Sequence, residues 1–93
     1  MHYFVQFSDD AKLDLKEALE YYSDISEDLK DRFEIELDKT IAILSKKPLH
    51  HQVRYKNIRI AFTAVFPYRI HYIIENEFVY ILKILHTTRF FKF

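Results

Sequence analysis

The chain has 93 residues with neither cysteine nor glycine, and its 14 Lys and Arg residues balance its 14 Asp and Glu residues. This length excludes a multidomain enzyme and predicts a single domain over residues 1–93. The lack of cysteine excludes a disulfide framework and Cys-ligated zinc, and the lack of glycine excludes nucleotide-binding phosphate loops. No segment is long and apolar enough for a membrane span or a signal peptide, so we expect a cytoplasmic protein.

The first half of the chain predicts a short strand and then two helices. Tyr3–Phe7 is rich in aromatic and β-branched residues, as is typical of a strand. Ser8 is a candidate N-cap for a helix over about residues 9–23, and Ser26 is a candidate N-cap for a second helix that ends near Lys46–Pro48. Because only two or three residues separate the helices, we expect an antiparallel helical hairpin.

After Pro48 the apolar pattern changes from helical spacing to alternation, which predicts three strands. They cover Ile58–Thr63, Tyr68–Glu75 and Val79–Leu85, joined by short turns. Three such strands form an antiparallel meander. We therefore expect an α+β fold in the order β-α-α-β-β-β, with the helical hairpin packed on one face of a small antiparallel sheet.

The balanced charge conceals a division along the chain. Residues 1–45 carry twelve acids and five bases, whereas residues 46–93 carry two acids and nine bases, so the two parts have net charges of −7 and +7. In the expected fold, basic residues alternate with core residues and project from the sheet face that the helices leave open. These are Arg54, Lys56, Arg59, Arg69, His71, His86 and Arg89. Such an asymmetry indicates an anionic partner.

Several segments, in order over nearly the whole chain, resemble the RelE/ParE superfamily of bacterial type II toxins, also called plasmid-stabilisation proteins. They are Ala11–Ala18 followed by Tyr21 and Tyr22, then Arg32, Phe33 and Leu37 in the second helix, and most clearly Tyr55–Arg59, Phe66–Tyr72 and Ile84–Arg89. The resemblance implies the fold described above. It also implies a partner, a cognate antitoxin whose disordered tail folds onto the toxin, and hence a toxin–antitoxin hetero-oligomer.

The resemblance leaves two mechanisms open. RelE-like members cleave messenger RNA on the ribosome without a metal; here, Arg69 and Arg59 would bind the phosphate, His86 would exchange a proton, and Arg89 would add charge. ParE-like members poison DNA gyrase without a known hydrolytic site. In that case the residues predicted to contact the target or the antitoxin are Arg54, Lys56, Tyr68, His71, Phe90 and Phe91.

Two features favour the ParE-like branch. RelE-like nucleases carry a tyrosine near the C-terminus, whereas no tyrosine follows Tyr80 here, and ribosome binding calls for a strongly basic protein. An endoribonuclease and a non-toxic module that binds only an antitoxin remain alternatives, so the sequence leaves open whether the chain is an enzyme. We expect no cofactor and no metal, because His50 and His51 are adjacent and no second ligand pair follows at zinc-site spacing.

Overall fold

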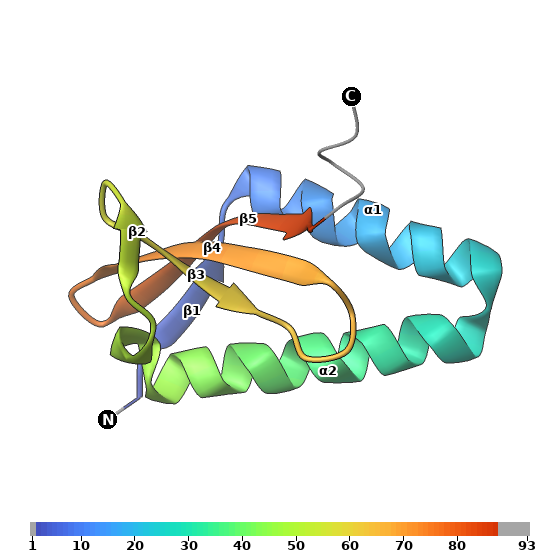
Figure 1. Cartoon of the computed structure of the whole chain (residues 1–93), viewed down its shortest axis with the longest axis horizontal. Helices are drawn as coiled ribbons and strands as arrows, with labels where there is room; N and C mark the ends of the chain where they lie inside the picture. The colour runs from blue at the N-terminus through green and yellow to red at the C-terminus, as the bar shows by residue number, and fades with distance from the viewer. Residues whose placement is uncertain (1, 88–93) are drawn as a thin grey trace.

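The fold is known from a computed structural model, which describes residues 2–87 of the chain. Two helices lie on one side of a five-stranded sheet (Figure 1). The elements, in chain order, are β1 (Phe4–Phe7), α1 (Asp9–Ile25), α2 (Glu27–Lys46), the short 3-10 helix η1 (Pro48–His50), β2 (Val53–Tyr55), β3 (Ile58–Phe62), β4 (Tyr68–Glu75) and β5 (Phe78–His86).

Both predicted helix caps are confirmed. The Ser8 hydroxyl accepts a hydrogen bond from the Ala11 N–H, and the Ser26 hydroxyl accepts one from the Leu29 N–H, each at 3.0 Å. Ser26 also ends α1, because its own N–H donates to the Tyr22 carbonyl at 2.9 Å. One residue thus separates the helices, and α1 is two residues longer than the sequence predicted. The hairpin is correspondingly tight.

The sheet confirms the expected fold class and adds two features to it. Its strand order is β1-β5-β4-β3-β2, and β1 pairs with β5 in parallel, so the sheet is mixed. A fourth strand after the helices, β2, forms the edge and pairs antiparallel with β3. The turn between them contains Lys56 with a φ of 52°, which a glycine would adopt more easily. The sequence did not predict β2, because a strand of only three residues shows too little alternation of apolar and polar side chains.

The core lies between the helices and one face of the sheet. Strand β4 contributes Tyr68, Ile70 and Tyr72 to this core, and each is at most 1% exposed. The helices contribute Ala11, Ala18, Tyr22, Phe33, Leu37 and Leu44, and the other strands contribute Ala61, Val79, Ile81 and Ile84. Since strand side chains alternate between faces, the residues between these point away from the helices. We call that second side of the sheet the open face.

Candidate functional site: the open face of the sheet

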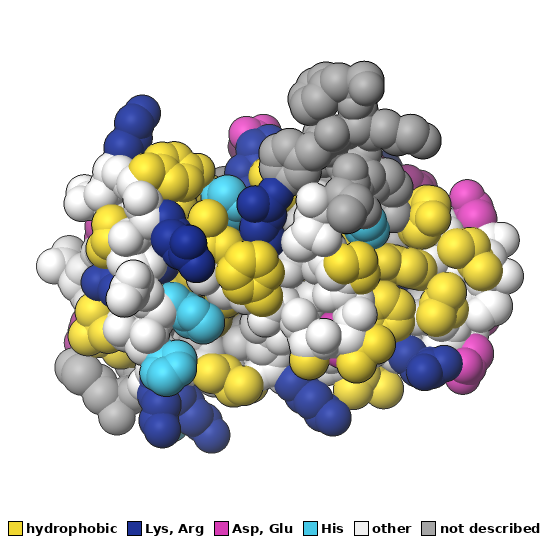
Figure 2. Space-filling model, in the orientation of Figure 1, with side chains coloured by type: hydrophobic (Ala, Val, Ile, Leu, Met, Phe, Trp, Pro, Cys, Tyr) yellow, Lys and Arg dark blue, Asp and Glu magenta, His cyan; other side chains and the backbone are white. Residues whose placement is uncertain are grey.

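Arg69 and His71 occupy the middle of the open face. Both alternate along β4 with the core residues, and cross-strand partners lie on the same side of a sheet. Arg69 is paired with Phe62 on β3 and Leu85 on β5, while His71 is paired with Ile60 and Lys83. The centre of the open face is therefore a cationic row bordered by apolar side chains. Figure 2 shows Lys, Arg and His side chains over the sheet and further Lys and Arg side chains along α2, with acidic side chains mainly at the end where the two helices meet.

His71 is the most constrained of these groups. Its side chain is 9% exposed, and Tyr55 on β2 forms a hydrogen bond with Nδ1 at 3.2 Å. Nε2 is buried without a hydrogen-bond partner among residues 2–87. Burial lowers the pKa of His71 below its ordinary value of 6.5, and the charges of Arg69 and Lys83 lower it further. At neutral pH, His71 is thus an uncharged group between two cations.

Lys83 joins the open face to the helical layer. Its Nζ lies 3.9 Å from Asp10 Oδ2 at the start of α1. The neighbouring Asp14 accepts a hydrogen bond from the Ile84 N–H at 2.9 Å, which fixes α1 to the same stretch of β5. Neither Lys83 nor Tyr55 was singled out from the sequence. Lys83 was detectable as the one cation in the alternation of β5, whereas the role of Tyr55 depends on a strand that the sequence did not predict.

Arg59 lies on the other side of the sheet from Arg69. It is paired with the core residue Tyr72, and its Nη1 donates a hydrogen bond to the His51 carbonyl oxygen. The expectation that Arg59 projects from the open face is therefore wrong. The reason is that β3 buries Ala61 and leaves Phe62 exposed, the reverse of the alternation read from the sequence.

His86 also lies on the helical side of the sheet. It is paired with Tyr68, and the two rings meet edge to face with centroids 5.2 Å apart. Hence the four residues assigned to ribonuclease chemistry are not brought together within the described part of the chain. Arg69 is on one side of the sheet, Arg59 and His86 are on the other, and Arg89 lies outside the described residues.

The residues predicted to contact a partner also divide. Arg54 and Lys56 are exposed on β2 and its turn, at the edge of the sheet. Tyr68 is 1% exposed and packs in the core against Phe33, so it is not on this surface. Tyr68 belongs to the core because it alternates in phase with Ile70 and Tyr72 on β4. Phe90 and Phe91 lie outside the described residues.

A second histidine, His51, lies between η1 and β2, with its ring centroid 6.5 Å from that of Tyr72. Burial lowers the pKa of His51, and the charges of His50, Arg54 and Arg59 add to that effect. Next to it, the Tyr72 hydroxyl donates to the Pro48 carbonyl at 2.6 Å, and burial raises the pKa of Tyr72 to about 12. These contacts hold η1 against the sheet, so this cluster has a structural explanation.

The described residues 2–87 contain no group of three or more His, Asp or Glu side chains placed to hold a metal ion. Within the same range, neither helix is long and apolar enough to cross a membrane.

Two helices over a mixed sheet of this order form the fold of a known toxin–antitoxin protein. The chain superimposes on a solved structure titled "Chromosomal ParDE TA system from P. aeruginosa" with a TM-score of 0.78, covering 91% of this chain and 96% of that one. The two sequences are 13% identical, so this likeness establishes the fold alone.

The family follows from the sequence model that matches residues 5–91, described as "ParE toxin of type II toxin-antitoxin system, parDE". The chain belongs to this family, which confirms the resemblance to RelE/ParE toxins and the ParE-like branch within it. It is accordingly a toxin of a type II toxin–antitoxin system. No curated protein sequence matches the chain.

Proposed function

We propose that this toxin inhibits growth by binding DNA gyrase through its open face, without breaking a bond itself. The observation that supports binding is the separation of Arg69 from Arg59 and His86 by the thickness of the sheet. Cleavage of RNA requires a proton-transferring group and cations around one phosphate, each within about 3 Å of the atom it serves. Two of the three described candidates face the helical layer instead.

The proposed contact surface combines charge with apolar area. Arg69, His71 and Lys83 form its centre, and Phe62 is 53% exposed beside Arg69. Arg54 and Lys56 extend the positive charge to the sheet edge. Desolvated apolar contacts supply affinity in such surfaces, while complementary charge speeds association and selects the partner. An acidic surface on the target fits this arrangement, and Arg89, Phe90 and Phe91 remain predicted contributors.

We further propose that a cognate antitoxin neutralises the toxin and forms a hetero-oligomer with it in the cytoplasm, where gyrase acts. The family assignment supports this partner. Exposed large apolar side chains, among them Phe4 at 62% and Val65 at 76% exposure, offer contacts that such a partner could cover.

The test is expression of the chain alone and with the neighbouring antitoxin gene, followed by three measurements. Growth, supercoiling by purified gyrase, and the 5′ ends of cellular messenger RNA distinguish the alternatives. We expect growth arrest, loss of supercoiling and intact messages, all reversed by the antitoxin. Site-specific cuts in translated messages, abolished by Arg69→Ala or His86→Ala, would establish the endoribonuclease instead. Undiminished growth with a stable antitoxin complex would establish the non-toxic module.

Matched variants locate the surface. Arg69→Ala removes a cation at the centre of the open face. It should raise the toxin concentration needed to inhibit gyrase by about tenfold, because truncating an arginine near the centre of an interface weakens binding strongly. Lys12→Ala removes an exposed cation from α1, away from that face, and should leave inhibition unchanged. Equal inhibition by both variants would exclude the open face as the contact surface.

A further inference from the structure

The end of the molecule where α2 stops carries basic residues and no acidic ones over a continuous stretch of chain. Residues 46–59 contain five Lys and Arg residues and two histidines, and no carboxylate follows Asp38 until Glu75. The stretch forms the end of α2, then η1, β2 and the start of β3, at the left of Figure 1. We call its exposed basic residues the basic edge; they are Lys46, Lys47, His50, Arg54 and Lys56.

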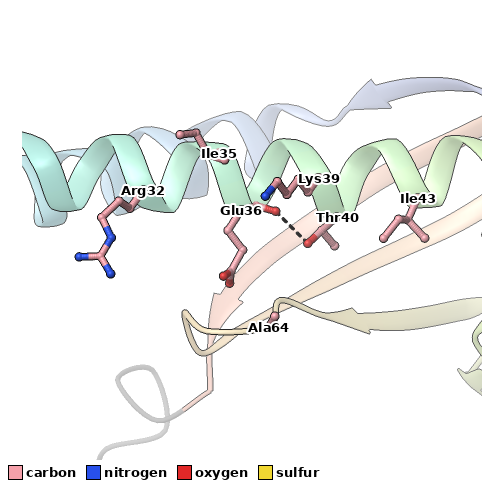
Figure 3. A pocket seen from close by; sticks show the side chains of 7 residues that line it. All are labelled: Arg32, Ile35, Glu36, Lys39, Thr40, Ile43 and Ala64. Atoms are coloured by element: carbon pink, nitrogen blue, oxygen red, sulfur yellow. Dashed lines mark hydrogen bonds between the residues drawn. The ribbon is translucent and has the colours of Figure 1, made fainter.

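The basic edge begins where the acidic residues of α2 end. Figure 3 shows the preceding stretch of α2, in which Glu36 lies along the helix between two cations. Beyond it, Lys46, Lys47 and His50 line a pocket of about 370 Å³. The end of α2 and η1 thus bring three basic side chains around one hollow.

Among residues 2–87, no carboxylate lies within ion-pair distance of the basic edge. The ion pairs in this part of the chain involve Lys30, Arg32 and Lys83. Glu75 and Glu77 lie at the turn between β4 and β5, and β3 separates those strands from β2. The positive charge of the basic edge is therefore uncompensated within the described residues.

The basic groups of this region also repel one another. Burial lowers the pKa of His51, and three neighbouring positive groups lower it further. These are His50, Arg54 and Arg59. Tyr72, which packs against the same ring, is uncharged at neutral pH because burial raises its pKa to about 12. An anion bound at the basic edge would offset this repulsion and favour the protonated form of His51.

The backbone that carries the basic edge is held in place. Arg59 Nη1 donates a hydrogen bond to the His51 carbonyl oxygen, and the Tyr72 hydroxyl donates to the Pro48 carbonyl at 2.6 Å. Both bonds join the sheet to the segment between α2 and β2. A surface that is fixed beforehand loses less entropy when a partner binds.

We propose that the basic edge binds the phosphate backbone of double-stranded DNA, independently of base sequence. Duplex DNA carries one negative charge about every 1.7 Å along its axis. A protein helix advances about 1.5 Å per residue, so it would reach that density only if nearly every residue were acidic. Lys and Arg side chains are the usual partners of phosphate groups, and such contacts read no sequence.

Single-stranded RNA is a poorer occupant. Binding of single strands depends on aromatic rings that stack with the bases. The aromatic rings next to the basic edge already contact other residues: His51 meets Tyr72 edge to face, and Tyr55 meets His71 with centroids 6.2 Å apart. Charge therefore dominates what this surface offers.

This inference does not rest on the proposed function. Arg54 and Lys56 also belong to the gyrase-binding surface proposed above, whereas Lys46, Lys47 and His50 do not. Variants of the two lysines therefore test DNA binding separately from inhibition of gyrase.

The test measures binding of the whole chain to a fluorescein-labelled duplex of about 20 base pairs by fluorescence anisotropy. At about 50 mM salt we expect a dissociation constant of about 1 to 100 μM, as is typical of non-specific DNA binding. The logarithm of the affinity should fall with the logarithm of the salt concentration at a slope of about −3.6, for four phosphate contacts. NMR amide shifts should change within residues 46–56.

Matched variants locate the site. K46A/K47A should weaken binding by at least about tenfold at low salt and make the slope shallower by about 1.8, because two phosphate contacts are lost. K12A/K16A makes the same charge change on exposed positions of α1 and should alter neither quantity. Circular dichroism verifies that each variant folds. An equal loss in both variants would overturn the proposal.

Binding should also depend on pH. A phosphate beside His51 raises a pKa that the free protein lowers, so the complex takes up protons and the affinity should rise as the pH falls from about 8 to about 6. His51→Gln should reduce this dependence. Affinity that is level or falls over this range would contradict binding of phosphate at the basic edge.

Competitors identify the chemistry of the ligand. Polyglutamate of equal charge and single-stranded RNA of equal length should each displace the duplex only at higher concentration than unlabelled duplex does. Displacement by polyglutamate at equal or lower concentration would identify an acidic protein as the partner, and the same result with RNA would identify a single strand. Either result would overturn the proposal, as would unchanged anisotropy at about 100 μM toxin in about 50 mM salt.

Discussion

The hydroxyl of Tyr55 and Nδ1 of His71 lie 3.2 Å apart, which joins the edge strand β2 to β4 across the intervening strand β3. β2 has only three residues, and its register with β3 shifts between Val53 and Tyr55. So short a strand gains little from backbone pairing alone. The tyrosine contact therefore contributes substantially to holding the sheet edge in place.

Replacing Tyr55 by phenylalanine tests that contribution. The hydroxyl is lost and Nδ1 of a buried histidine is left without its partner, so the free energy of unfolding should fall by about 1 to 2 kcal/mol, measured by urea denaturation. Tyr80→Phe is the control, because the Tyr80 hydroxyl makes no hydrogen bond among the described residues 2–87. A loss of equal size in both variants would mean that the Tyr55–His71 contact stabilises nothing.

The lowered pKa of His71 and of His51 predicts how stability depends on pH. A histidine whose pKa is lower in the folded protein binds protons more readily when unfolded. The free energy of unfolding should be level above about pH 6.5 and should decline as the pH falls from there through the folded-state values. His71→Gln should reduce this slope. An NMR titration that placed the pKa of His71 at or above 6.5 would contradict the prediction.

Glu36 should contribute more to stability than an acidic residue on the free side of α2. Glu36→Ala removes the carboxylate that accepts from Val65 and Phe66, and hydrogen bonds to charged groups contribute about 1.5 to 3 kcal/mol. Thermal unfolding should therefore shift downward by several degrees. Glu34→Ala, which loses a 3.9 Å contact with Lys30, is the matched control and should melt close to the unaltered chain.

Two phenylalanines should separate folding from binding. Phe33 is 0% exposed and packs against Tyr22, Phe66 and Tyr68 with ring centroids 4.9 to 5.3 Å apart, so Phe33→Ala should cost about 3 to 5 kcal/mol. Phe62→Ala should change stability little, because that side chain is 53% exposed, and should instead weaken inhibition of gyrase. Denaturation and supercoiling assays on both variants check the pair; a Phe62→Ala protein that inhibits fully would argue against the open face.

The helices and the antiparallel order of β3, β4 and β5 could be predicted from the sequence because their determinants are local. Ser8 and Ser26 cap the helices through hydrogen bonds to residues three positions away. Asn76 turns β4 into β5 at a φ of 55°, in the left-handed region that asparagine tolerates. Such signals do not depend on the rest of the fold.

The faces of the strands were harder to predict, because the large apolar residues of β3 lie on the side of the sheet away from the helices. Ile60 and Phe62 resemble a core face, yet pairing with β4 places them beside His71 and Arg69 and turns Arg59 toward the helices. The register also shifts between His71 and Tyr72, so alternation along β5 does not persist. The pairing between strands therefore decides which cations share the open face. The sequence of a single strand does not contain that information.

The parallel pairing of β1 with β5 determines when the toxin can finish folding. Phe4 to Phe7 pair with Phe78 to Ile81, and the Ser8 hydroxyl donates to the Leu82 carbonyl across 74 residues of sequence. Contacts between such distant residues form late, since the whole intervening chain must first be brought together. During synthesis, β1 has no strand to pair with until β5 has left the ribosome. The completed sheet therefore forms only after β5 has emerged, and until then the helices lack the full sheet face against which their apolar side chains pack.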